Sequence, residues 1–437
     1  MTARTQMWLA SALVGISASA FSLLRLWLGN QQAITQNLWA EDGLFPLCIR
    51  KAGVFTCLAD PFAGYFLFIP RVLAWPVAAL PWAMWATAAN VIAAVLAGLV
   101  AALVVLILRG AGIGWYATVL LALLPVLAPM SGLEAINSIG SSYMLLLYSG
   151  VLLVLFRPDR GRAWTMFSSV FLLITALTIP SAVVILAVVI IQVVRRAIRP
   201  ATAASWAGAL GIGLAVQAYV ALTATTQRPV QLTGESVSAW ADSVPVSLLT
   251  YWPGLSIGEY SFFTNFTLGP STLSGWLFVA IIAGLGLWRV SKGWRDKDHA
   301  STAVGLLLLS GLAMGLIPSA IGYTNNRYFV VPLLLWGAAL LVWLDPVIRR
   351  TRPWVLALVT AIIAIVWWPS MPASEFRSTP APPWQDEVAR VEAKCLSDPA
   401  FIDRPIFSPF WPPNWGDGLD EPTHPNLPCT TVYRWLP

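Results

Sequence analysis

Long apolar stretches, separated by short segments that carry most of the charge, run along nearly the whole chain. Several of them exceed the ~18–20 apolar residues that a helix needs to cross a bilayer. Lipid cannot satisfy backbone polar groups, so each span must be a helix that closes its own hydrogen bonds. The pattern therefore predicts an all-α polytopic membrane protein with eleven spans. We place them at residues 7–28, 84–108, 115–129, 139–156, 164–177, 181–194, 203–224, 273–287, 303–321, 328–344 and 354–366.

Two segments interrupt this regular pattern. Residues 65–81 are apolar, but they contain three prolines and Arg71. Proline breaks a regular span and the neighbouring tryptophans favour the membrane interface, so we expect a helix lying along the outer surface. Residues 164–194 form two short spans split at Pro180, which indicates either a tight hairpin or a broken helix.

The basic residues predict an orientation in the cell membrane. Most of them gather in loops on one side of the eleven-span arrangement, and this side is cytoplasmic by the positive-inside rule. The amino terminus is then inside, before an uncleaved first helix, and the carboxyl tail is outside. The formal charge of +6 thus indicates orientation and not nucleic-acid binding. The four main loops contain Arg157, Arg160 and Arg162; Arg195, Arg196 and Arg199; Arg289, Lys292, Arg295 and Lys297; and Arg349, Arg350 and Arg352.

The same orientation divides the chain into two parts. Residues 1–367 form the membrane domain, with a first outer loop at 29–83 and a long outer loop at 225–271. Residues 368–437 form an extracytoplasmic tail rich in proline and tryptophan, which is typical of irregular structure. The tail is too short for an ordinary independent catalytic domain, so we expect it to cap the membrane part.

The four cysteines all fall on the predicted outer side. Cys48 and Cys57 belong to the first outer loop, and Cys395 and Cys429 belong to the tail. An oxidising compartment favours disulfides, and we expect the pairs Cys48–Cys57 and Cys395–Cys429. The alternative is four free thiols.

Two adjacent carboxylates, Glu41 and Asp42, follow the first span in a chain where only 11% of residues are charged. A soluble domain has about 25%, so a pair at the membrane surface points to function. Neighbouring side chains diverge by about 100° on a helix. One can therefore act as a general base or bind a metal while the other orients a neighbour. The alternative is a solvated loop pair or a helix cap.

The order of residues after this pair resembles the first outer loop of the GT-C glycosyltransferases. The pair Glu41-Asp42 is followed by Asp60-Pro61-Phe62-Ala63-Gly64-Tyr65 and then by Pro70-Arg71. This class includes the aminoarabinose transferases of lipid A and the protein O-mannosyltransferases. The resemblance extends to the hydropathy plan and implies a GT-C-like bundle with interfacial helices in this loop. One departure is that a later outer loop shows no second acidic pair.

The resemblance implies a sugar donor carried on polyprenyl phosphate and an extracytoplasmic acceptor, which is a glycan, a lipid or a protein. Asp42 is then the base that activates the acceptor hydroxyl, because it precedes Gly43, and Glu41 is its partner. We expect no nucleotide site and no nucleic-acid partner. Membrane lipid surrounds the spans. A divalent metal ion is compatible with the site, but the chemistry does not require one.

Outward-facing arginines are the candidates for binding the donor phosphate. Arg71 follows an interfacial proline, and Arg327, followed by Tyr328, begins a span from the outside. Tyr65 and Glu134 are assigned to the same outer cavity as substrate-binding residues. The alternatives are helix capping for Glu134 and snorkelling to lipid headgroups for the arginines. Snorkelling is the favoured interpretation for Arg25, near the outer end of the first span.

Two other classes compete with the transferase. A transporter or lipid flippase needs ionisable residues in mid-span and broken helices at the bilayer midplane, and only the break at Pro180 suggests one. A polysaccharide polymerase or ligase also uses lipid-linked sugars, but it relies on outer arginines and histidines. The acidic pair favours the transferase.

Disulfide mapping tests the compartment. Mass spectrometry without reduction should find Cys48 joined to Cys57 and Cys395 joined to Cys429. The first bridge closes a shorter loop and therefore restricts the unfolded chain less, so losing the tail bridge should lower the stability more. Free thiols at all four positions would contradict both the pairing and the predicted side.

Overall fold

The computed structural model identifies a mostly helical membrane protein. Six of its helices are long and apolar enough to cross a membrane. The structure describes residues 2–29, 38, 41–62, 64–128, 137–156, 161–223, 272–320, 329–367, 384–398, 402–403 and 427–428.

Each of the eleven predicted spans coincides with a helix. The six long ones are α1 (Ala3–Gly29), α6 (Trp85–Gly110, entered through the short helix η1, Trp82–Met84), α11 (Pro200–Thr223), α13 (Thr272–Arg295), α14 (His299–Ala320) and α15 (Val330–Ile348). The shorter ones are α7 (Trp115–Leu127), α8 (Tyr143–Phe156), α9 (Arg162–Thr178), α10 (Val183–Val194) and α16 (Pro353–Trp367). Hydropathy thus located these helices, while membrane crossing by the shorter five remains a prediction.

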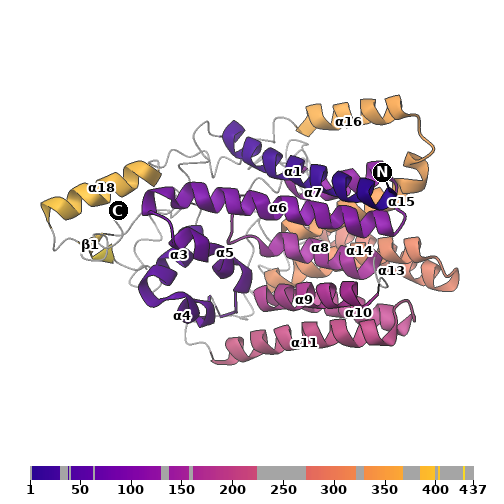
Figure 1. Cartoon of the computed structure of the whole chain (residues 1–437). Helices are drawn as coiled ribbons and strands as arrows, with labels where there is room; N and C mark the ends of the chain where they lie inside the picture. Colours follow the sequence, from indigo (N-terminus) through magenta and orange to yellow (C-terminus); the bar gives the residue numbers. More distant parts are fainter. Residues whose placement is uncertain are drawn as a thin grey trace.

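The helices form a bundle with two different ends (Figure 1). One end carries three helices of the segment between α1 and α6, namely α3 (Glu41–Ala52), α4 (Val54–Ala59) and α5 (Phe68–Ala78), together with α18 (Trp384–Ser397) of the tail. We call it the loop end. The amino terminus lies at the opposite end, which we call the basic end because it holds Arg109, Arg195 and Arg349. Its assignment to the cytoplasm remains a prediction.

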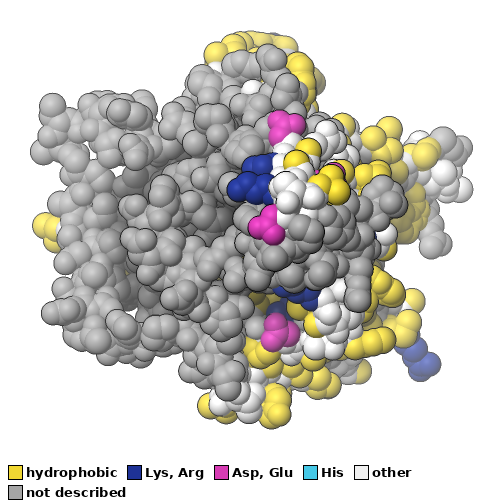
Figure 2. All heavy atoms as spheres, turned by 90° about the vertical axis from the view of Figure 1, so that its left-hand side faces the viewer, with side chains coloured by type: hydrophobic (Ala, Val, Ile, Leu, Met, Phe, Trp, Pro, Cys, Tyr) yellow, Lys and Arg dark blue, Asp and Glu magenta, His cyan; other side chains and the backbone are white. Residues whose placement is uncertain are grey.

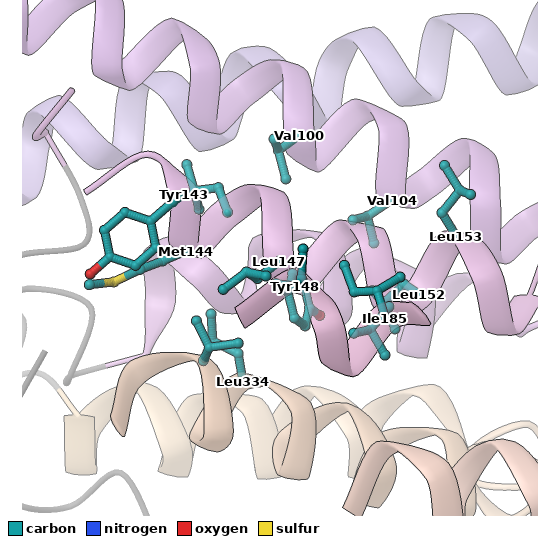
Figure 3. Packing of buried hydrophobic residues seen from close by; sticks show 14 of the residues in the cluster. Val100, Val104, Tyr143, Met144, Leu147, Tyr148, Leu152, Leu153, Ile185 and Leu334 are labelled. Atoms are coloured by element: carbon teal, nitrogen blue, oxygen red, sulfur yellow. The ribbon is translucent and has the colours of Figure 1, made fainter. Parts of the chain in front are cut away.

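Helix α8 forms the centre of the bundle, and its residues from Tyr143 to Leu155 are all buried. Figure 3 shows it surrounded by side chains of α6, α10 and α15, among them Val100, Ile185 and Leu334. The Tyr148 hydroxyl donates a 2.8 Å hydrogen bond to the carbonyl oxygen of Leu121 in α7. Pro125 lies four residues later in α7 and lacks the N–H that this carbonyl would otherwise accept. The tyrosine therefore satisfies a backbone group that lipid could not.

Three helix pairs approach closely at small residues. An added Cβ on Gly98 of α6 would lie 2.5 Å from the Gly15 carbonyl oxygen of α1. A Cβ added to Gly305 of α14 would lie 2.6 Å from the Gly286 carbonyl oxygen of α13. A Cβ added to Gly213 of α11 would lie against the side chain of Ala176 in α9. Such contacts are the usual way in which helices associate in lipid, where burying apolar surface gains little.

The proline-rich segment forms α5, an 11-residue helix that is too short to span a bilayer. It is anchored to the bundle at its start, where the Ile69 N–H donates to Thr178 Oγ1 of α9 at 3.3 Å. Arg50 of α3 caps its other end by donating to the carbonyl oxygens of Ala78 and Leu80. The segment is therefore a helix packed across the loop end of the bundle.

The chain reverses direction between α9 and α10. Thr178 lies at the loop end, whereas Arg195, just after α10, donates a 3.2 Å hydrogen bond to the Gly293 carbonyl oxygen at the basic end. Ile179 is extended, and a short helix, η3 (Pro180–Ala182), leads into α10. The split at Pro180 is therefore a chain reversal and not a break within one continuous helix.

Covalent and aromatic contacts organise the loop end. A disulfide joins Cys48 of α3 to Cys57 of α4, which confirms that predicted pair. Cys395 of α18 is also disulfide-bonded, and its predicted partner Cys429 lies outside the described residues. The tail strands β1 (Ile402–Asp403) and β2 (Leu427–Pro428) pair antiparallel. The bridge between Cys395 and Cys429 therefore stays a prediction.

The described helix of the tail docks on the membrane domain. The Trp384 indole N–H of α18 donates to the Trp82 carbonyl oxygen at 2.9 Å, and its ring packs on the rings of Trp82 and Trp85. Val388, Val391 and Cys395 continue this buried cluster. The tail therefore covers the beginning of α6.

Replacing Gly98 by valine tests the closest helix contact. The new side chain would overlap α1, and overpacking of this kind costs about 1–3 kcal/mol. We expect a clearly lower Tm in detergent. Gly284→Val is the matched control, because Gly284 lies in α13 with open space around an added Cβ. An unchanged Tm for Gly98→Val would contradict the packing.

Cysteine labelling in intact cells tests the orientation. Asp386 of α18 and Arg295 at the end of α13 are both exposed, and the described part of the chain contains no free cysteine. An impermeant maleimide should label Asp386→Cys in intact cells and should label Arg295→Cys only after the membrane is opened. The reverse pattern would place the tail in the cytoplasm.

Candidate functional site

Asp42 is buried at the loop end, with 1% of its surface exposed. It lies in the first turn of α3, and its Oδ1 accepts hydrogen bonds from the Gly140 N–H at 2.7 Å and the Ser138 hydroxyl at 3.0 Å. Residues 137–142, which lead into α8, are all buried as well. The solvated-loop interpretation is therefore wrong for Asp42.

Two helix amino termini surround this carboxylate. It belongs to the first turn of α3 and is bonded to the segment directly before α8. The amino end of a helix carries a partial positive charge that attracts the oxygen atoms of a carboxyl group, and two donors fix the position of Oδ1. The site therefore presents a fixed, desolvated carboxylate. Glu41 is the first residue of α3, and its side chain lies outside the described ones.

The segment before α8 is itself anchored to the first span. Asn137 adopts a positive φ of 56°, a conformation that asparagine tolerates better than most residues. Its side-chain amide donates to the Ser22 carbonyl oxygen at 2.7 Å and accepts from the Ser22 hydroxyl at 2.8 Å. Helix α1 thereby fixes the position of the groups that hold Asp42.

Arg25 lies on the same stretch of α1 and is fully buried. Its guanidinium donates to the carbonyl oxygens of Val126 and Ala128 at 2.8 and 2.9 Å. These carbonyls end α7 and have no partner within the helix. The expectation that Arg25 snorkels to lipid headgroups is wrong, because the carboxyl end of α7 attracts the cation more than water at the surface does.

Arg71 of α5 is also buried, with 3% of its surface exposed, so snorkelling is wrong here too. Its guanidinium donates to the Leu58 carbonyl oxygen near the end of α4 at 3.3 Å and lies 6.0 Å from the ring centre of Phe45. Burial lowers the pKa of Arg71 to about 10, although Asp60 and Tyr65 act in the opposite direction. Arg71 is therefore still a cation at neutral pH.

Tyr65 forms the end of a tight turn beside this arginine. The backbones of Phe62 and Tyr65 exchange hydrogen bonds of 2.9 and 3.1 Å, and Gly64 between them adopts φ +84°, which favours glycine. The Phe62 ring packs edge-on against the rings of Phe45 and Tyr65. An aromatic cluster thus joins the turn to α3.

The structure brings together three predicted site residues through Phe45. Asp42 and Phe45 are three residues apart on α3 and so lie on the same side of the helix. The Arg71 guanidinium and, through Phe62, the Tyr65 ring pack against Phe45. The Arg71 cation therefore lies against Phe45, on the side of α3 that also carries the buried Asp42. The other predicted positions, Glu134, Arg327 and Tyr328, lie outside the described residues.

Gln217 of α11 is a site residue that the sequence reasoning missed. It is 3% exposed; its Oε1 accepts from the Phe66 N–H at 2.8 Å, and its Nε2 donates to the carbonyl oxygens of Phe66 and Ala176 at 2.7 and 3.1 Å. The side chain holds the strand-like segment before α5 against α9 and α11. A lone amide within an apolar span was the available signal.

Figure 2 views the loop end, where acidic and basic side chains of the described residues lie close together on the surface. Among the described residues, no three His, Cys, Asp or Glu side chains gather as a potential metal site. A scan against protein-family models and a search of curated proteins found no match to this chain. The chemistry of the site is therefore argued from its own residues.

Proposed function

We propose that this protein is an integral membrane glycosyltransferase of GT-C type. It transfers a sugar from a polyprenyl-phosphate carrier to an acceptor outside the cytoplasm, which is a glycolipid, a cell-envelope polysaccharide or a protein. The observation that carries the proposal is the buried Asp42 carboxylate, held by Ser138 and Gly140 at the loop end of the bundle.

The fixed position of Asp42 suits a general base, which must meet the acceptor hydroxyl in one geometry. The acceptor hydroxyl oxygen attacks the anomeric carbon of the donor sugar while Asp42 takes the hydroxyl proton. The bond between the anomeric carbon and the phosphate oxygen breaks, and its electron pair leaves with the polyprenyl phosphate. The sugar passes through an oxocarbenium-like state. Because Asp42 is already fixed by two hydrogen bonds, little ordering is required when the acceptor binds.

The leaving phosphate needs cationic partners in a medium of low dielectric constant. Arg71 remains charged at neutral pH, and its guanidinium has five N–H donors, of which the described contacts use one. Its hydrogen bond to Leu58 also gives it a structural role at the end of α4. Arg327, with Tyr328, is the second proposed phosphate ligand, and Tyr65 and Glu134 complete the proposed substrate site.

The transporter alternative receives less support from the buried charges. The charged side chains that are buried within described spans are Arg25 and Asp345. Arg25 binds the last carbonyl groups of α7, and Asp345 accepts a 3.0 Å hydrogen bond from the Gly114 N–H and pairs with Arg349. Both lie near helix ends and satisfy structural groups, whereas a transport path would need them at the midplane.

Asp42→Asn tests the proposed base. The amide oxygen can still accept from Gly140 and Ser138, so the fold should survive, but the basic charge is lost. A general base of this kind contributes roughly 10²–10⁴-fold, and we expect turnover to fall at least by the lower factor. The assay measures transfer from a panel of synthetic polyprenyl-phosphate sugars, and thermal shift measures donor binding, which should persist.

Three further variants separate the roles at this site. Asp386→Asn removes an exposed carboxylate of α18 that has no assigned role in the site, and it should leave turnover near normal. Arg327→Ala should weaken donor binding before it affects turnover, because it removes a charge-assisted contact to phosphate. Glu41→Gln should give an intermediate loss. Near-normal transfer by Asp42→Asn would show that Asp42 is not the base.

A further inference from the structure

A cluster of cations and tryptophan rings lies at the basic end, far from Asp42. The guanidinium of Arg289 in α13 lies 4.8 Å from the ring centre of Trp288 and 5.4 Å from that of Trp343 in α15. The ammonium of Lys292, one helical turn further, lies 5.5 Å from the Trp288 ring. We call these four residues the tryptophan–cation cluster.

The two cations of this cluster lack anionic partners in the described part of the chain. Neither side chain forms an ion pair or a hydrogen bond there. Other basic residues of this end are already engaged: Arg349 pairs with Asp345, and Arg109 donates to the carbonyl oxygen of Ile113. The cluster thus retains positive charge that is not neutralised.

The aromatic rings give this charge a defined position. Trp288 and Trp343 are 47% and 51% exposed, so their outer faces are open to the surroundings of the bundle. Contacts between cations and rings restrain the long Arg289 side chain across the gap between two helices. Nearer the start of both helices, the rings of Phe278 in α13 and Trp336 in α15 pack edge-on at 5.6 Å, so the two helices also touch there.

We infer that the tryptophan–cation cluster binds the phosphate group of an anionic phospholipid. Exposed tryptophans on a membrane helix occupy the headgroup level of the bilayer, where a lipid phosphate is the most abundant anion. Basic pockets between membrane helices bind such headgroups. Arg289 and Lys292 lie about one turn apart, so both can contact the oxygens of one phosphodiester. The tryptophan rings can pack against the glycerol and the upper part of the acyl chains.

The variant Arg289→Gln/Lys292→Gln removes the charge and preserves the size of both side chains. Both residues lie on the surface of the bundle, so the fold should persist, which Tm and circular dichroism will check. The control Arg350→Gln/Arg352→Gln removes two exposed charges from the same end, where neither arginine contacts an aromatic ring in the described part of the chain. The control separates lipid binding at the tryptophan–cation cluster from the general attraction of anionic lipid to any positive charge at this end.

Native mass spectrometry of the full chain, titrated with phosphatidylglycerol or with phosphatidylcholine of the same acyl chains, measures lipid affinity. Each surface cation contributes about 1 kcal/mol to the binding of anionic lipid, so the cluster variant should bind phosphatidylglycerol roughly tenfold or more weakly. The control variant should match the unaltered protein, and the cluster variant should lose much less affinity for phosphatidylcholine, because choline neutralises the charge of its phosphate. Undiminished phosphatidylglycerol binding by the cluster variant, or an equal loss in the control, would overturn the inference.

Discussion

The close approach of α1 and α6 is the contact on which the arrangement of the loop end depends. Lipid provides almost no hydrophobic drive to bring two helices together, so the two backbones must gain their attraction from contact at short range. Gly15 and Gly98 allow that contact because neither adds a side chain between the helices. These two helices begin and end the first outer loop. Their spacing therefore determines where the loop starts and where it returns.

Several buried polar side chains bond to backbone groups of a neighbouring segment and so join the segments around the loop end. Asn137 binds both polar atoms offered by Ser22, and Gln217 pairs with both backbone groups of Phe66. Arg25 binds the last carbonyls of α7. Each buried amide or cation thus joins a loop or a helix end to a span, and together they hold the residues around Asp42 in place. A carboxylate with so few degrees of freedom is suited to chemistry.

Hydropathy alone located the helices because apolar segments in lipid must close their own backbone hydrogen bonds, but only six of the described helices are long enough to confirm a span. It also predicted that residues 65–81 would form a helix other than a span, since three prolines interrupt them. It did not predict the direction of Arg25 or Arg71. A sequence shows that a charged residue lies near a helix end, but it does not show which carbonyl groups will bind that residue. The partner of Arg25 lies in α7, about a hundred residues away, and the partner of Arg71 lies in α4, on the other side of a turn.

Arginine performs two different tasks in the bundle, and the basic end shows both of them, because Arg109 and Arg195 also donate to carbonyl oxygens there. At the loop end, Arg25, Arg50 and Arg71 each donate to carbonyl groups at the carboxyl end of a helix, so their charge is used inside the protein. At the basic end, Arg289 rests against tryptophan rings and leaves its charge available to the surroundings. A buried arginine loses its hydration, and fixed carbonyl dipoles must offset that desolvation penalty. An exposed arginine keeps its hydration and contributes positive potential to the protein surface. The first arrangement stiffens the loop end, and the second leaves a positive charge available for the lipid headgroup that we infer.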